Sequence, residues 1–149
     1  MTIEAYIASL KTMQKDLPKK VDEIILKNKG LIVGMLKFRL YNKGTDGNGM
    51  LIGRYSKNTI PIKIANSQKT SFITLRDQGH FYAGMFLEAR KNEYVIDSTD
   101  RKADLLVQIY GKSIMELTKE QQDNVVSNII DPDIQKYLNG LSGSIEIDL

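Results

Sequence analysis

The stretch "MFLEARKNEYVIDS" at residues 85–98 decides the fold class of this chain. It reads as a strand, a turn at Lys91–Asn92–Glu93 and a second strand, and it is the clearest hairpin pattern in the sequence. Segments with helical periodicity lie before and after it. A small antiparallel sheet placed between helical regions predicts an α+β fold, with a long N-terminal helical region and C-terminal helices.

Two apolar stripes with helical spacing precede the hairpin. Within residues 2–17 the apolar side chains recur at three- and four-residue steps, and Thr2 stands where an N-cap is expected. A second and longer stripe runs through residues 21–40. Because Pro18 separates the stripes, the sequence predicts two N-terminal helices or one kinked helix.

Glycines predict two backbone features after the first stripe. Gly30 and Gly34, four residues apart, would let another helix approach closely, although each weakens its own helix by about 1 kcal/mol. Residues 41–50, "YNKGTDGNGM", then form a loop that needs positive φ, with Asp46 and Gly49 as its turn residues. Counted from Asp46, the fifth, sixth and twelfth positions lack the residues of a calcium loop, so a tight structural turn is the better interpretation.

Residues 50–98 are expected to hold strands and an extended arm. In the arm, Ile60, Ile62 and Ile64 alternate with other residues at the period of a half-buried strand. Pro61 would confine such a strand to a sheet edge or to an irregular extension. An extended segment of this kind could lie across a neighbouring molecule as an added strand.

Residues 99–140 predict helices. The first is short and stops at Gly111. Thr118 and Gln121 form a capping box for a second helix of about a dozen residues, which we expect to break at Asp131–Pro132.

The chain as a whole is predicted to be one domain over residues 1–140, with a helical region at 1–42 and a flexible tail at 141–149. Its net charge of +3 hides an asymmetry, because residues 1–70 carry 13 Lys/Arg and 5 Asp/Glu whereas residues 71–149 carry 8 and 13. This polarity suits a basic surface facing nucleic acid, or head-to-tail packing of identical subunits. The simpler alternative is that both ends are solvated.

Composition excludes several classes of site. No cysteine and a single histidine occur among the 149 residues, so disulfides, thiolate nucleophiles and multi-histidine metal sites are excluded. We expect no metal and no cofactor. No apolar run approaches the length of a membrane span, and the N-terminal stretch lacks the continuous apolar core of a signal peptide, so we expect a soluble protein with no membrane partner.

His80 and Asp77 are the residues that could suggest catalysis. With Ser71 they would place a whole triad within ten residues, without a nucleophile elbow to orient it. The glycine-rich loop follows a helix and precedes an extended segment, whereas phosphate-binding loops run from a strand into a helix. We therefore expect no enzymatic activity.

The segment "TLRDQGHFYAGM" at residues 74–85 is better explained as a turn. Gly79 supplies backbone freedom, Asp77 can accept hydrogen bonds from amides within the turn, and His80 points outward. The apolar residues that would anchor the following strand in the core are Leu75, Phe81 and Met85.

Two segments, 46–59 and 74–85, give the chain a family resemblance. In this order, ahead of a hairpin, they resemble the minor-tail and tail-completion proteins of tailed bacteriophages, also called virion morphogenesis or head–tail joining proteins. The chain departs from that pattern at Gln78, where threonine is usual, and at Gly84, where serine is common. The matching residues are Asp46, Gly49, Leu51, Tyr55, Ser56, Thr59, Leu75, Arg76, Asp77, Gly79, Phe81 and Met85.

The resemblance spans about residues 20–115 and implies a non-enzymatic virion protein, assembled in the bacterial host cytoplasm. It implies a ring at the neck or tail, with copies of the chain, portal or connector proteins, tail-tube proteins and DNA in the channel as partners. Structural turns would be made by Asp46, Gly49, Asp77 and Gly79, and the candidate assembly interface consists of Ile60, Ile62, Ile64 and His80.

A second hypothesis belongs to another class, a small DNA-binding accessory protein. Its N-terminal helices carry many lysines, which could contact phosphates or an acidic partner without sequence preference. Aromatic residues do not interleave with these charges as a single-strand stacking platform would require, and a solvated lysine face is the simpler interpretation. The candidate contacts are Lys11, Lys15, Lys19, Lys20 and Lys27, extended by Lys29, Lys37 and Arg39.

Overall fold

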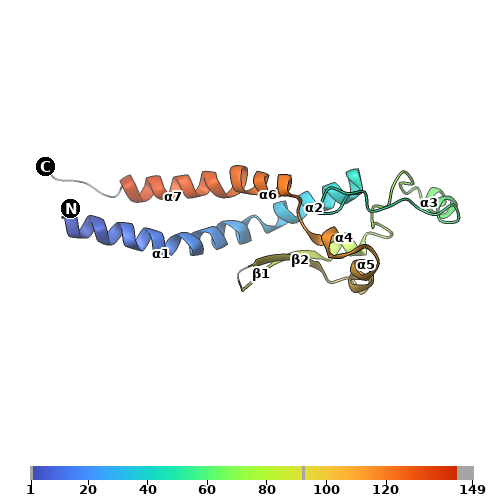
Figure 1. Ribbon diagram of the computed structural model, residues 1–149, viewed down its shortest axis with the longest axis horizontal. Helices are drawn as coiled ribbons and strands as arrows, with labels where there is room; N and C mark the ends of the chain where they lie inside the picture. Colours follow the sequence, from blue (N-terminus) through green and yellow to red (C-terminus); the bar gives the residue numbers. More distant parts are fainter. Residues whose placement is uncertain (1, 92, 144–149) are drawn as a thin grey trace. The chain divides into compact units, whose positions relative to one another are not determined.

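The computed structural model describes residues 2–91 and 93–143, and its fold is α+β, as predicted (Figure 1). Contacts divide the chain into two compact units. Unit 1 combines Met1–Asn28 with Asp123–Leu149, and unit 2 is Lys29–Gln122. The single domain expected over residues 1–140 stays a prediction. In the part that the structure describes, no helix is both long and apolar enough to cross a membrane.

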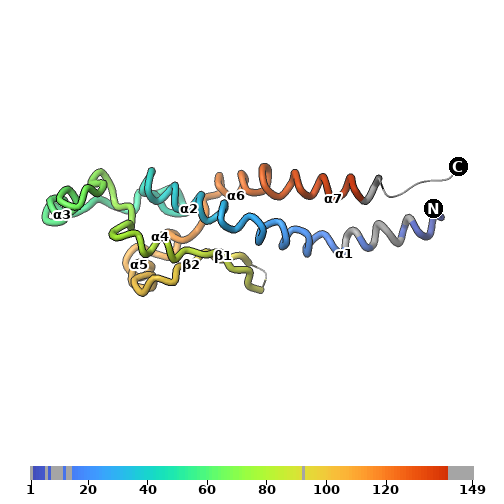
Figure 2. Tube along the Cα trace, turned by 180° about the vertical axis from the view of Figure 1, so that it is seen from behind, coloured from blue at the N-terminus to red at the C-terminus, as the bar shows by residue number. Residues whose placement is uncertain are grey.

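Unit 1 is built from the two ends of the sequence. Helix α1 (Ile3–Lys27) lies alongside the C-terminal helices in both Figure 1 and Figure 2. Thr2 is the predicted N-cap, since its hydroxyl accepts a hydrogen bond from the Ala5 amide at 3.1 Å. The C-terminal partners of α1 are a π-helical segment η2 (Val126–Ile130) and α7 (Asp131–Gly143). Helix α6 (Lys119–Val125) leads into η2. The buried apolar residues described in unit 1 are Ile24, Ile25, Val125 and Ile129.

A division between two helices at Pro18 and a break at Asp131–Pro132 are both wrong, whereas the alternative of one helix that contains Pro18 fits α1. Pro18 lies inside α1, which continues to a C-cap at Asn28. Pro132 is the second residue of α7, which follows η2 directly. A proline inside a helix lacks an N–H donor, and its ring crowds the carbonyl four residues earlier. Directly before Pro132 the helix is π-helical, and this wider turn accommodates the missing donor and the crowded carbonyl. Residues 141–143 of the predicted tail continue α7, and 144–149 lie outside the described residues.

Unit 2 is centred on the predicted hairpin. Strand β1 (Met85–Arg90) pairs antiparallel with β2 (Glu93–Ser98), in a register that runs from Met85↔Ser98 to Arg90↔Glu93. Asn92 of the predicted turn lies outside the described residues. Helix α2 (Lys29–Lys43) packs against β1, and the core between them includes Leu36, Leu40, Met85, Leu87 and Ile96.

The glycines of α2 do not mark a close helix contact. A Cβ added at Gly30 or Gly34 would meet no atom within 4 Å, so the predicted close approach is wrong for this chain. By contrast, the positive φ predicted for the following loop is found at Gly44 (60°) and Gly49 (76°).

The predicted strand at residues 60–65 is instead a short helix, α3 (Ile60–Ala65). Ser56 and Thr59 form the turn before it, and Pro61 sits in the first helical turn, where a missing N–H costs nothing. Upstream, Leu51 makes only an isolated bridge with Thr45. The other short helices are α4 (His80–Ala83), α5 (Ala103–Tyr110), which ends at Gly111 as predicted, and the 3₁₀ helix η1 (Lys112–Met115).

Candidate functional site

The first segment of the resemblance forms a turn held by Asp46. Its Oδ1 accepts hydrogen bonds from the amides of Asn48 (2.9 Å) and Met50 (3.0 Å), and its Oδ2 accepts one from the Ser113 hydroxyl (3.0 Å). Burial by itself raises the pKa of Asp46, but these hydrogen bonds and the charge of Arg39 outweigh it, so the pKa lies below that of an ordinary aspartate. Asp46 thus joins this turn to the segment that follows α5.

Arg39 is hydrogen-bonded to Thr45, next to this turn, whereas the sequence predicted it on an exposed basic surface. It is only 3% exposed, so its assignment to a nucleic-acid-facing surface is wrong. Its guanidinium donates to the carbonyls of Thr45 (2.8 Å), Glu116 (2.7 Å) and Ile114 (3.3 Å) and to Oε1 of Gln121 (2.8 Å). Burial lowers the pKa of Arg39, and the Asp46 carboxylate partly opposes that effect.

Gln121 connects Arg39 to the predicted capping box. The amide of Thr118 donates to Gln121 Oε1 and the amide of Gln121 donates to the Thr118 hydroxyl, both at 3.1 Å, so the box is confirmed. The Gln121 side chain also donates to the carbonyl of Met35 at 2.9 Å. The Gln121 carboxamide therefore caps the start of α6 and also binds α2 through the Met35 carbonyl.

The second segment of the resemblance is a turn held by two tyrosines. The hydroxyl of Tyr55 accepts from the amide of Thr74 at 3.2 Å, and the hydroxyl of Tyr82 donates to the Thr74 carbonyl. Leu75 and Gly79 both have positive φ, at 60° and 91°. Burial raises the pKa of Tyr82, which suits a phenol that stays protonated as a donor. Because Tyr55 belongs to the first segment, the two segments of the resemblance meet at Thr74.

Asp77 and His80 are not paired with each other in the described part of the chain. The Asp77 carboxylate lies 3.6 Å from the Lys102 ammonium. Within the described residues 74–85 no turn amide donates to it, so the predicted acceptor role of Asp77 is wrong. Across residues 2–91 and 93–143, no hydrogen bond or ion pair links His80 to Asp77 or Ser71. His80 is exposed at the start of α4, as the sequence suggested, and Leu75, Phe81 and Met85 are buried as expected.

An open pocket of about 1000 Å³ lies beside this turn, between α3, α4 and α5. It brings together four of the predicted site residues, Ile62, Asp77, Gly79 and His80. The predicted residues Asp46, Gly49, Ile60 and Ile64 do not line it. Cations outnumber acids in its wall, where Lys63, Arg76, Arg101 and Lys102 face Asp77 and Asp100, so the pocket suits contact with an acidic surface. Among the described residues, no three His, Cys or acidic side chains could hold a metal ion.

Five of the lysines proposed for DNA lie on α1 in unit 1, whereas Lys29 and Lys37 lie in unit 2. Lys15, Lys19 and Lys27 are exposed on α1, and Lys20 lies 3.7 Å from Glu23 and over the ring of Tyr137. The side chain of Lys11 is outside the described residues. Helix α1 carries five lysines and four acidic residues, so its net positive charge is small.

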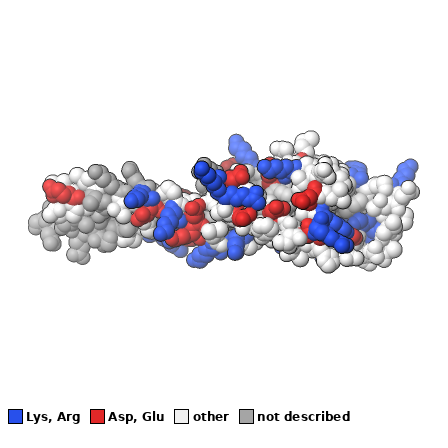
Figure 3. All heavy atoms as spheres, turned by 90° about the horizontal axis from the view of Figure 1, so that it is seen from below, with Lys and Arg blue, Asp and Glu red and all other residues white. Residues whose placement is uncertain are grey.

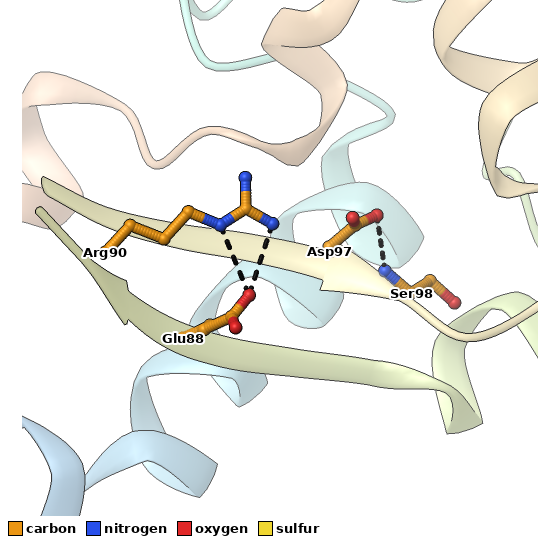
Figure 4. A network of polar contacts seen from close by, with 4 residues as sticks. All are labelled: Glu88, Arg90, Asp97 and Ser98. Carbon is orange, nitrogen blue, oxygen red and sulfur yellow. Dashed lines mark hydrogen bonds and ion pairs between the residues drawn. The ribbon is translucent and has the colours of Figure 1, made fainter.

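Unit 2 exposes apolar residues at several places, and two of them, α3 and the hairpin, also differ in charge. On α3, which buries none of its residues, Ile62 is 62% and Ile64 is 63% exposed, whereas Ile60 is half-buried. On the hairpin, Phe86 is 37% exposed beside Val95. Acidic side chains surround this pair, and Arg90 contacts Glu88 across 3.2 Å (Figure 4).

Unit 2 thus combines two connected turns, a basic pocket, and exposed apolar residues on α3 and on the hairpin. Comparisons of the chain with protein-family models, with curated proteins and with solved structures found no match.

Proposed function

We propose that the chain is a structural virion protein of a tailed bacteriophage or prophage, acting at the head–tail neck or in the tail as a tail-completion or minor-tail protein within a ring. The observation that carries this proposal is α3, which presents Ile62 and Ile64 to solvent beside a basic pocket. Neighbouring exposed apolar residues rimmed by charge are typical of protein–protein contact sites. The proposal therefore keeps Ile62, Ile64 and His80 as assembly residues.

The connection between the two turns supports the same proposal. Tyr55, Thr74 and Tyr82 join the segments that carry the family resemblance. The Asp77 carboxylate of the second turn forms an ion pair with the Lys102 ammonium. This pairing favours a structural role for Asp77 over proton transfer. Both turns thus position α3 and the pocket rather than a reacting group.

The proposal is tested in a host strain that carries the gene and releases particles. We expect mass spectrometry to find the chain in purified particles, and deletion of the gene to leave heads and tails unjoined or tails incomplete in electron micrographs. Complementation with the Ile62→Asp, Ile64→Asp double variant should fail, whereas Ile109→Asp, a similarly exposed residue of α5, should restore infectivity. Infectious tailed particles from the deletion strain would rule the proposal out.

The DNA-binding alternative is favoured by the exposure of Lys15 and Lys19, one helical turn apart on α1. It predicts duplex binding that weakens steeply with salt and is abolished by the changes Lys19→Glu and Lys20→Glu together. Binding that is absent, or insensitive to salt, would remove this alternative.

A further inference from the structure

Unit 2 carries an uneven distribution of charge. Between residues 47 and 76 the sequence contains five cations and no acidic residue, and α3 lies in the middle of this stretch. Figure 3 shows blue but no red spheres at the right-hand end of unit 2, which is the end of the unit that α3 occupies in Figure 1. The five cations are Arg54, Lys57, Lys63, Lys69 and Arg76.

Helix α3 divides its apolar residues between two sides. Residues 61, 64 and 65 share one face because they lie three and four positions apart, and Pro61, Ile64 and Ala65 are all exposed. Ile62 lines the pocket on another side. The Lys63 ammonium lies 5.0 Å from the centre of the Tyr55 ring and donates to the Arg76 carbonyl at 3.4 Å, which ties α3 to the second turn. The face centred on Ile64, which we name the α3 face, is left without a partner in the described chain.

The outer face of the hairpin has the opposite charge. The pairs Phe86↔Asp97, Glu88↔Val95 and Arg90↔Glu93 project on the side away from the buried residues of β1 and β2. Phe86 and Val95 are therefore framed by three carboxylates and one guanidinium, and that guanidinium is already bound to Glu88 (Figure 4). We name these six residues the hairpin face.

The two faces lie at opposite ends of unit 2. In Figures 1 and 2, α3 marks one end of the unit, and the turn between β1 and β2 lies toward the other. One copy therefore cannot join its own two faces. We propose that the α3 face of one copy docks on the hairpin face of a second copy, with Ile64 against Phe86 and Val95, and the lysines and arginines around α3 near Glu93 and Asp97.

This contact is heterologous, so it repeats from copy to copy and generates a ring or a filament. A symmetric contact between two α3 faces would instead oppose Lys57 and Lys63 to the same residues of the other copy, with no acidic residue within residues 47–76 to balance them. The inference rests on the proposed function for its setting, because a neck or tail ring needs a contact of this directional kind.

The experiment uses the full-length chain and sedimentation velocity across a concentration series. Wild-type protein is expected to form species larger than the 16.9 kDa monomer, and fewer of them at high salt. Ile64→Glu alters the α3 face, whereas Phe86→Lys and, separately, Glu93→Lys alter the hairpin face. Each is expected to weaken association at least about tenfold. Ile109→Glu and Leu105→Lys, on exposed positions of α5, are the matched controls and should associate like wild type.

Mixing the variants decides the direction of the contact. An Ile64→Glu copy keeps a working hairpin face and a Phe86→Lys copy keeps a working α3 face, so the mixture should form dimers and nothing larger. A wild-type chain that stays monomeric overturns the inference. So does a mixture that fails to dimerise although circular dichroism shows both variants folded, or a hairpin-face variant that associates like wild type. The proposed function fails by a different observation, the absence of the chain from particles, so the two failures can be told apart.

Discussion

Arg39 is a buried residue that joins segments of unit 2 far apart in the sequence. Its guanidinium donates to the carbonyls of Thr45, Ile114 and Glu116. Replacing it with methionine would keep much of the apolar stem but leave these acceptors without a donor. Hydrogen bonds to a buried charge are worth roughly 1.5–3 kcal/mol each and are not additive. We therefore expect Arg39→Met to lower the free energy of unfolding by about 3 kcal/mol.

Urea unfolding measures this change, and Lys37→Met on the same helix is its control. The control is expected to change the free energy of unfolding by less than about 0.5 kcal/mol, as surface substitutions usually do. Equal effects of the two substitutions would show that the Arg39 hydrogen bonds do not contribute to stability.

Asp46 makes the stability of unit 2 depend on pH. Its pKa is lower in the folded chain than in the unfolded one, because the folded carboxylate accepts hydrogen bonds from Met50, Asn48 and Ser113. The stabilisation is complete above the unfolded value of about 3.9 and is lost as pH falls through the lower folded value. Asp46→Asn should thus be less stable than wild type near neutral pH, and the difference should shrink below about pH 4. Unfolding curves that keep a constant difference across this range would contradict the assignment.

Gly84 and Gly34 should respond oppositely to a side chain. A Cβ at Gly84 would lie 2.6 Å from Thr99 Oγ1 and 3.1 Å from the Asp100 amide nitrogen, whereas at Gly34 it would meet nothing. Gly84→Ser, which introduces the residue common in the resembling family, should cost about 1–3 kcal/mol. Gly34→Ala should add about 1 kcal/mol through helix propensity. Thermal unfolding of both variants tests the pair, and a Gly84→Ser chain as stable as wild type would refute the packing argument.

Among the elements, α1 carries the clearest local defect. Pro18 lies in its interior, where proline is about 3 kcal/mol less favourable than alanine, partly offset by up to about 1 kcal/mol from the stiffer unfolded chain. Pro18→Ala should slow amide hydrogen exchange in the neighbouring turns of α1. Pro61→Ala is the control, since Pro61 occupies the first turn of α3, where it fits. Unchanged exchange in α1 would mean that the helix already opens elsewhere.

The prediction of elements succeeded where one local interaction decides the structure. The Thr2 cap, the Thr118–Gln121 box, the stop at Gly111 and the hairpin all depend on residues close together in sequence. The prediction failed at residues 60–65, where the same sequence pattern is compatible with a strand and with a helix. Alternating isoleucines predict a strand, yet Pro61 fits a first helical turn equally well. The choice between a strand and a helix at these residues depends on their surroundings in the fold, which the sequence pattern does not give.

At the scale of the whole molecule, the fold redistributes charge. The sequence has a basic first half and an acidic second half, but unit 1 carries 6 Lys/Arg and 9 Asp/Glu and unit 2 carries 15 and 9. The reason is that unit 1 contains both α1, with its five lysines and four acidic residues, and the C-terminal segment, in which acidic residues predominate. Only the arrangement of the chain reveals this, as it alone reveals that Arg39 is buried and that Ile62, Asp77 and His80 share a pocket.

Unit 2 should fold on its own. Its buried residues from Ile32 to Met115, and the hydrogen bond from Arg39 to Gln121, all lie within residues 29–122. A chain cut to these residues is expected to show a cooperative thermal transition and the far-ultraviolet dichroism of an α+β fold. The two segments of unit 1, mixed as peptides, should remain largely unfolded because they bury few apolar residues. A 29–122 chain that is disordered at 25 °C would contradict this division.

The position of the Arg39 acceptors has a consequence for synthesis on the ribosome. Arg39 emerges from the ribosome 75 residues before Ile114, and still further ahead of Glu116 and Gln121. Likewise Ile24 and Ile25 of α1 emerge long before Val125 and Ile129, which are the other buried apolar residues described in unit 1. Neither unit can close until its later segment has been made, so the nascent chain keeps its apolar stripes accessible to chaperones up to that point.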